Sequence, residues 1–142
     1  MKARNSLLRL KKFRVEDLGR RLATLDEMNA DLERKLADLE ESVAREKQRA
    51  SDSEIGRLAF PSFLQSIETR RNNIGATMQE LSRERTTVQE ELSAAVQDLK
   101  SFEATELERE RRLAEAAARE THTRSENLAL VRHLKKHTAR QI

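Results

Sequence analysis

Residues 51–63 decide the fold, and they read Ser51-Asp52-Ser53-Glu54-Ile55-Gly56-Arg57-Leu58-Ala59-Phe60-Pro61-Ser62-Phe63. This stretch holds the only proline of the sequence and one of its three glycines. Proline has a fixed φ and no backbone N–H, so it fits the first turn of a helix and not its interior. Ser62 and Gln65 form a capping-box pattern, a second signal for a helix start. We therefore predict a turn at about residues 56–61 that folds one long helix back on another.

The composition is typical of long helices with little interior. Of the 142 residues, 37% are charged and 3% are aromatic, and there is no cysteine to form disulfides or thiolate sites. Ala, Leu, Glu, Arg and Lys dominate, as they do in coiled coils. No apolar run approaches the roughly 18 residues that span a bilayer, and no signal-peptide core follows the basic start. We expect a single all-α domain over residues 1–142, located in the cytoplasm.

A heptad pattern predicts the first helix at about residues 5–55. Its apolar positions alternate in steps of three and four, which forms a stripe along one partner helix. The seam positions are Leu8, Lys11, Val15, Leu18, Leu22, Leu25, Asn29, Leu32, Leu36, Leu39, Val43, Glu46 and Ala50. Asn29 either fixes the register at some cost in stability or is a tolerated polar residue.

The pattern resumes after Pro61 and predicts a longer second helix at about residues 62–138. Charged residues interrupt it at Arg71, Arg85, Glu106 and Arg109. The apolar seam positions are Leu64, Ile67, Ile74, Met78, Leu81, Val88, Leu92, Ala95, Leu99 and Phe102. The two stripes together predict an antiparallel coiled-coil hairpin, and a 3.5-residue period predicts a left-handed supercoil.

The charged seam residues predict a register. In an antiparallel pair, the numbers of facing residues sum to a constant. A constant of about 117 places Glu46 opposite Arg71, and Lys11 opposite Glu106, so that opposed charges partly cancel. A constant of about 110 would set Glu46 and Lys11 against leucine, where an unpaired charge is costly. We therefore predict the first register, with the bend centred near Leu58.

This register leaves residues 110–142 overhanging, without a partner in their own chain. At 1.5 Å per residue, the overhang would extend on the order of 45 Å. Its far end carries an apolar stripe beside basic residues, which indicates a partner-binding surface, although a partly disordered tail is the alternative. The candidate residues are Leu128, Val131, Arg132, Lys135 and Lys136.

The N-terminal turns are basic as well. Six basic residues precede the first acid, Glu16, and Leu10 and Phe13 widen the apolar surface beside the seam. This end is either a surface that docks a partner or a membrane, or a frayed solvated end. A hairpin with two basic terminal segments and an acidic body favours an acidic partner. Nucleic-acid binding is not expected, because stacking aromatic residues and a recognition motif are absent.

No motif for catalysis or cofactor binding is present. The sequence lacks a GxxxxGK[ST] loop, a GxGxxG pattern and a Ser-His-Asp set in a context that closes a pocket. His133 and His137 share a helix face, but no acid lies beyond Glu126 to complete a metal site. We expect no enzyme activity, no cofactor and no metal.

Residues 63–68, Phe63-Leu64-Gln65-Ser66-Ile67-Glu68, followed by Ile74, resemble the aromatic-aliphatic start of the second helix in the FliJ family. This family comprises flagellar type III export proteins and has injectisome counterparts of the YscO type. The length of the chain, its two unequal Leu-rich helices and its lack of cysteine are also similar to that family.

The resemblance implies a non-enzymatic stalk, similar to the central-stalk gamma subunit of rotary ATPases. Its open end would enter the pore of a hexameric export ATPase and promote ring assembly and hydrolysis. The body near the turn would meet the cytoplasmic domain of an export-gate membrane protein and escort export chaperones. Phe63, Ile67 and Arg70 are the expected gate-facing residues, although Ile67 is also a seam residue. The protein would be a monomeric hairpin, peripherally associated with the inner-membrane export apparatus.

Two other functions stay open on the sequence alone. A generic structural coiled coil, serving as a spacer or dimeriser, would form parallel dimers or trimers. A basic peripheral binder of membrane or nucleic acid would show steep salt dependence and affinity for anionic lipid or DNA.

Overall fold

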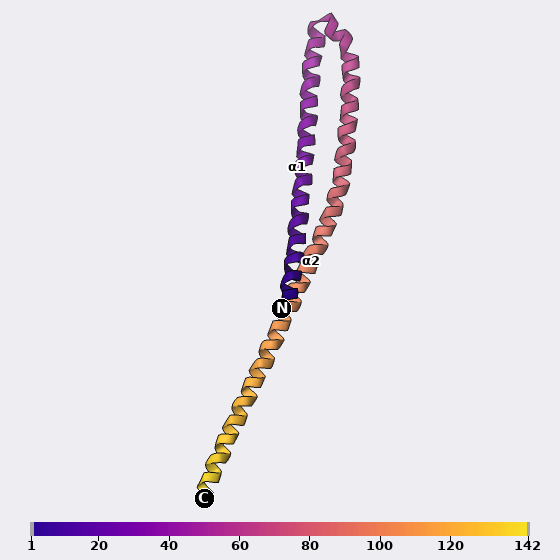
Figure 1. The fold of residues 1–142 in the computed structure, drawn as a ribbon. Coiled ribbons are helices and arrows are strands. Elements are labelled where there is room, and N and C mark those ends of the chain that lie inside the picture. Colours follow the sequence, from indigo (N-terminus) through magenta and orange to yellow (C-terminus); the bar gives the residue numbers. More distant parts are fainter. Residues whose placement is uncertain (1, 142) are drawn as a thin grey trace. The chain divides into compact units, whose positions relative to one another are not determined.

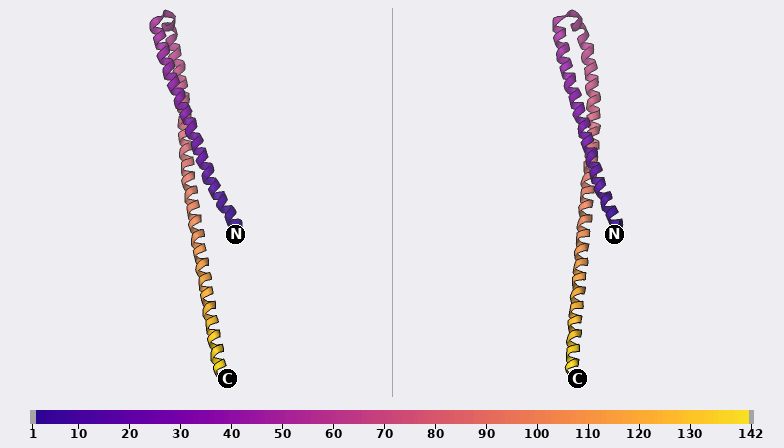
Figure 2. Two further views of the ribbon diagram at one scale, coloured as in Figure 1. Left: turned by 90° about the vertical axis from the view of Figure 1, so that its left-hand side faces the viewer. Right: turned by 60° about the vertical axis from the view of Figure 1, so that its left-hand side comes forward.

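The computed structural model describes residues 2–141 and consists of two α-helices (Figure 1). Helix α1 spans Lys2–Asp52 and helix α2 spans Glu54–Gln141, and no strand occurs among the described residues. Residue contacts divide the chain into two units, Met1–Gln97 and Asp98–Ile142. In the first unit α1 and α2 run antiparallel from the turn, and Figure 2 shows them side by side near it from two further directions. The all-α hairpin with a longer second helix is thus confirmed; residues 1 and 142 of the predicted domain lie outside the described residues.

The predicted seams are the buried faces of the two helices in the first unit, except at Leu64, which is exposed although it was predicted to lie in the seam. Every predicted seam position from Leu8 to Ala50 is buried or half-buried, as is the α2 stripe from Ile67 to Ala95 except at Arg85. The buried apolar residues are Leu18, Leu25, Leu39, Ile67, Leu81, Val88 and Ala95. Since burial of a large aliphatic side chain contributes about 1.5–3 kcal/mol, the packing of these stripes, more than helix propensity, stabilises the hairpin.

The turn lies earlier than the sequence predicted. Only Ser53 separates α1 from α2, so the predicted turn at residues 56–61 is wrong and the helix bounds shift with it. The hydroxyl oxygen of Ser53 accepts a hydrogen bond from the backbone N–H of Gly56 at 2.9 Å, which is the bond of a helix N-cap. The cap that starts α2 is therefore Ser53, and the Ser62–Gln65 pattern lies inside the helix.

Gly56 allows α2 to begin directly against the end of α1. A Cβ at Gly56 would lie 2.6 Å from the carbonyl oxygen of Arg49 and 2.9 Å from the Ser53 hydroxyl oxygen. Only glycine accepts such a close approach of backbone. The backbone N–H of Ser53 donates to the Arg49 carbonyl at 3.0 Å, so hydrogen bonding of the helical type continues to the break itself.

Pro61 lies inside α2, close to its start. Because proline has no N–H, it cannot donate to the carbonyl of Arg57, and its ring pushes that turn open. Such a position produces a kink, and Figure 1 shows α2 bending near the turn. Pro61 therefore lies within the second helix and does not start it.

The register is one heptad away from the predicted one. Among the described residues, ion pairs that join the two helices of the first unit include Arg21 with Glu84, Asp26 with Arg85 at 2.7 Å, and Glu40 with Arg71 at 2.5 Å. The residue numbers of these pairs sum to 105, 111 and 111, so the constant is about 110 and the predicted 117 is wrong. In an antiparallel hairpin the constant is twice the residue number at the centre of the bend. A bend centred on residues 53–56 therefore requires a constant of about 110.

Two of the seam charges that favoured the longer register, Arg71 and Glu46, have other partners. Arg71 pairs with Glu40 on the flank of α1, and Glu46 pairs with Arg49 of its own helix at 2.9 Å. Long charged side chains reach from the seam to its edge, so they need no opposite charge inside it. The pairing of Lys11 with Glu106 would join residues of different units and stays a prediction.

The second unit is the C-terminal part of α2. Leu99, Phe102, Glu106 and Arg109 are half-buried, and every residue from 110 to 140 is exposed. Within the helices described, none combines the length and the apolar character needed to cross a membrane.

Candidate partner-binding surfaces

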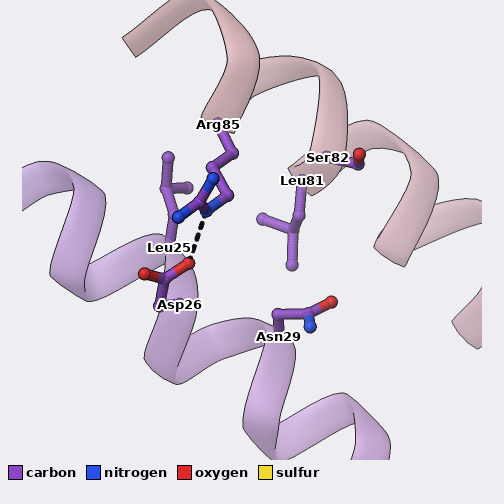
Figure 3. Close-up of a pocket in the computed structure, with 6 residues that line it drawn as sticks. All are labelled: Leu25, Asp26, Asn29, Leu81, Ser82 and Arg85. Carbon is purple, nitrogen blue, oxygen red and sulfur yellow. Dashed lines mark hydrogen bonds and ion pairs between the residues drawn. The ribbon is translucent and has the colours of Figure 1, made fainter. Parts of the chain in front are cut away.

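A small, partly open pocket lies between the two helices of the first unit and is shown in Figure 3. Its volume is about 160 Å³, and its lining residues are Leu25, Asp26, Asn29, Leu81, Ser82 and Arg85. Leu81 of α2 points towards Asn29 of α1. Beside them, Arg85 Nε donates to Asp26 Oδ1 at 2.7 Å, and this hydrogen bond raises the pKa of the Arg85 guanidinium. Organic ligands occupy pockets of about 300–1,000 Å³, so this pocket is a gap in the seam and not a ligand site.

The side-chain amide of Asn29 donates a hydrogen bond within α1. Its Nδ2 donates to Glu33 Oε1 at 3.2 Å, one turn along the same helix. A polar residue that fixes register does so through a partner on the facing helix. The local bond favours the second of the two interpretations, in which Asn29 is a tolerated interruption of the seam.

The structure separates the three residues predicted to face an export gate. Ile67 is only 2% exposed and packs in the seam, so it has no surface to offer a partner, and its assignment to the patch is corrected. Phe63 is half-buried, whereas Arg70 is exposed. Arg70 lines an open groove of about 420 Å³ together with Lys35, Asp38, Leu39, Ser42, Asn73 and Ile74.

An exposed apolar pair at the turn was not predicted. Ile55 is 82% exposed and Leu58 is 77% exposed, more than any other large apolar side chain of the described residues. Both fall outside the two heptad frames, and both lie in the first turns of α2. They place a small apolar surface at the turn, next to the Ser53 cap.

The predicted N-terminal residues are exposed on α1. Leu10 and Phe13 both lie outside the seam packing, and the guanidinium of Arg20 lies over the Phe13 ring at 5.7 Å from its centre. A cation in this position is attracted to the electron-rich face of the ring. This contact holds one face of Phe13 beside a positive charge.

The predicted C-terminal residues are exposed on α2, in the second unit. Val131 and Leu134 line a shallow apolar groove on the helix surface with Lys135, Thr138 and Ala139. Leu128 lies one turn before Val131, and Arg132 and Lys136 flank the row. The arrangement is an amphipathic face with cations at its border, which suits a partner that is apolar at its centre and acidic at its rim.

No protein-family model, curated protein or solved structure matches this chain. Among residues 2–141, no group of three or more His, Cys, Asp or Glu side chains is placed to hold a metal ion. The surfaces that remain are the N-terminal face, the groove near the turn and the C-terminal stripe. They are suited to binding macromolecular surfaces.

Proposed function

We propose that this chain is a non-enzymatic stalk component of a bacterial flagellar type III protein export apparatus, which promotes assembly and activity of the export ATPase ring. The observation that carries the proposal is the change in burial along α2. Its seam positions from Ile67 to Arg109 are buried or half-buried except at Arg85, whereas every residue from 110 to 140 is exposed. An apolar stripe with no cover in its own chain is a surface for another molecule.

Coupling to an ATPase would follow from preferential binding. If the stripe around Leu128 and Val131 binds the assembled ring and not its separate subunits, mass action favours the ring. Hydrolysis rises with ring assembly, because the ring is the active state of the partner. The chain contributes binding energy and no catalytic group.

The end near the turn would serve the other contacts in this proposal. The groove that holds Arg70, with half-buried Phe63 nearby in α2, offers a site for the cytoplasmic domain of an export-gate protein. Exposed Ile55 and Leu58 offer an apolar contact for export chaperones. The protein would then be cytoplasmic and peripherally associated with the inner-membrane export apparatus.

The test is to mix the chain with a cognate export ATPase and to measure hexamer formation and hydrolysis. The wild type should raise both, and Leu128→Glu with Val131→Glu should abolish the effect, because two charges then replace the apolar stripe. The control is Ile55→Glu with Leu58→Glu, which adds the same charges at the turn and should leave the effect intact. Absence of any effect by the wild-type chain counts against the proposal.

A structural spacer or dimeriser is the second candidate, and the same exposed stripe on α2 favours it. Light scattering separates the two, because a single chain has a mass of 16.4 kDa. A stalk should be monomeric in solution, whereas a spacer that pairs through residues 110–140 should show twice that mass or more. The double variant Leu128→Glu with Val131→Glu should then return a dimer to the monomer.

A further inference from the structure

The first turns of α1 present an apolar face that the hairpin does not cover. Leu7, Leu10 and Phe13 are 41%, 63% and 57% exposed. At 100° per residue these three side chains lie within about 120° of arc, on the flank of the seam. We call them the N-terminal face. Asp17 follows on the same side and pairs with Arg20 at 3.7 Å, which marks the end of the face.

Positive charge lies at both ends of this face. By helical periodicity Lys2 and Arg9 lie just beyond Phe13, whereas Arg14 lies about 20° inside the opposite end of the arc, beside Leu7. All three are exposed, and none is paired with an acid within residues 2–141. No acid precedes Glu16 in the sequence. The charges are therefore available to an anionic surface.

A membrane suits this face better than a protein does. A stable protein interface buries about 800 Å² on each partner, which three apolar side chains over two turns do not provide. An interfacial helix needs only a few inserted apolar residues, with basic side chains at the level of the headgroups. Each such lysine or arginine is attracted to the negative surface of anionic lipids. The apolar residues of the N-terminal face suit insertion, and the nearby cations suit the negative charge of the lipid surface.

We propose that the N-terminal face binds an anionic lipid bilayer, with Leu7, Leu10 and Phe13 inserted between the headgroups. Arg9, just outside the face, and Arg14, beside Leu7, lie against lipid phosphates. This site is distinct from the stripe on α2, and it does not depend on the proposed function, because any anionic membrane offers the same chemistry. It would hold α1 against a bilayer while α2 stays available to other partners.

The chain contains no Trp and no Tyr, so a single tryptophan reports on its own surroundings. Phe13→Trp should show blue-shifted emission with vesicles of phosphatidylcholine containing phosphatidylglycerol, and no shift with phosphatidylcholine alone. Leu58→Trp, at the exposed turn, is the matched control and should not shift with either vesicle. A shift of the Phe13→Trp emission that is equal for neutral and anionic vesicles overturns the proposal, as does the lack of any shift.

Partition measured by vesicle co-sedimentation tests the residues directly. Leu10→Gln with Phe13→Gln should weaken binding to anionic vesicles about tenfold or more, because the inserted apolar area is lost. Both positions are exposed, so the variant should keep the helix content of the wild type, which circular dichroism measures. Leu128→Gln with Val131→Gln should leave binding within about twofold. Retained binding by the first variant overturns the proposal, and loss by the second alone would assign membrane binding to α2.

Discussion

The carbonyl oxygen of Arg49 occupies the space that a side chain on Gly56 would need, 2.6 Å from the position of an added Cβ. This approach allows a single residue, Ser53, to separate α1 from α2 and to cap α2. The centre of the bend is thereby fixed near residue 55. Since the bend sets which residues face each other, this one contact determines the register along the first unit.

Gly56→Ala should destabilise the hairpin. The added methyl group would clash with backbone atoms of Arg49, which cannot move without opening the turn, so we expect the free energy of unfolding to fall by about 1–3 kcal/mol. Gly75→Ala is the matched control, because nothing lies within 4 Å of its Cβ position. That change should raise stability by about 0.5–1 kcal/mol. Urea unfolding followed by circular dichroism measures both, and effects of the same sign at the two glycines would contradict this account.

The register can be tested by cross-linking, because the chain has no native cysteine. Asn29→Cys with Leu81→Cys should form an intramolecular disulfide on mild oxidation, since both residues line one pocket and Leu81 points to Asn29. Asn29→Cys with Val88→Cys should not, although that pair would face in a register of about 117. Electrophoresis without reductant separates the closed form from the open form. Efficient disulfide formation by the second pair alone would support the register of about 117.

The sequence predicted which residues are buried far better than which residues face each other. Periodicity identifies the buried face of a helix from the sequence of that helix alone. The predicted seam positions from Leu8 to Ala50 are buried or half-buried, as expected. A repeating heptad leaves alternative registers one heptad apart, so the choice depends on the turn. The sequence pattern indicates a helix start at Pro61, whereas Ser53 and Gly56 form the turn. Because the position of the turn sets the register, the error in the turn led to the error in the register.

The candidate surfaces were predictable to a similar degree. Leu10 and Phe13 are exposed because they lie off the paired seam, which periodicity shows. Leu128 and Val131 belong to residues 110–140, every one of which is exposed. Ile67 was expected both to contact a partner and to lie in the seam. Its burial shows that it lies in the seam. The groove beside Arg70 depends on which residues of the two helices are opposed, so it followed from the register and could not be predicted without it.

Replacing the polar seam residue should stabilise the hairpin. Asn29→Leu would place apolar atoms against Leu81 in this pocket, and we expect a gain of about 1–2 kcal/mol in the free energy of unfolding. Asn72→Leu places the same substitution on the exposed side of α2 and should change stability by less than about 0.5 kcal/mol. Thermal and urea unfolding give the comparison. A loss of stability in the Asn29→Leu variant would mean that its amide has a structural role beyond the bond to Glu33.

An ion cluster should make the helix of the second unit sensitive to acid. Arg111 donates from Nη2 to Glu108 Oε1 at 2.6 Å and from Nε to Oε2 at 3.0 Å, and its Nη1 donates to Glu115 at 2.5 Å. The bonds from Arg111 lower the pKa of Glu108 below its ordinary value of 4.5. A carboxylate with a lowered pKa in the helix stabilises it above the unfolded pKa, and this contribution is lost as the pH falls through the lowered value.

Amide hydrogen exchange around Arg111 should therefore accelerate, relative to the intrinsic rate, as the pH falls from about 5 to about 3 at low salt. In Glu108→Gln the exchange should be faster at neutral pH and should change less over that range, because the titrating group is gone. Glu110→Gln is the control: Glu110 is exposed and forms no ion pair within residues 2–141, so the acid response should match the wild type. An unchanged acid response in Glu108→Gln would show that the cluster does not hold this part of α2.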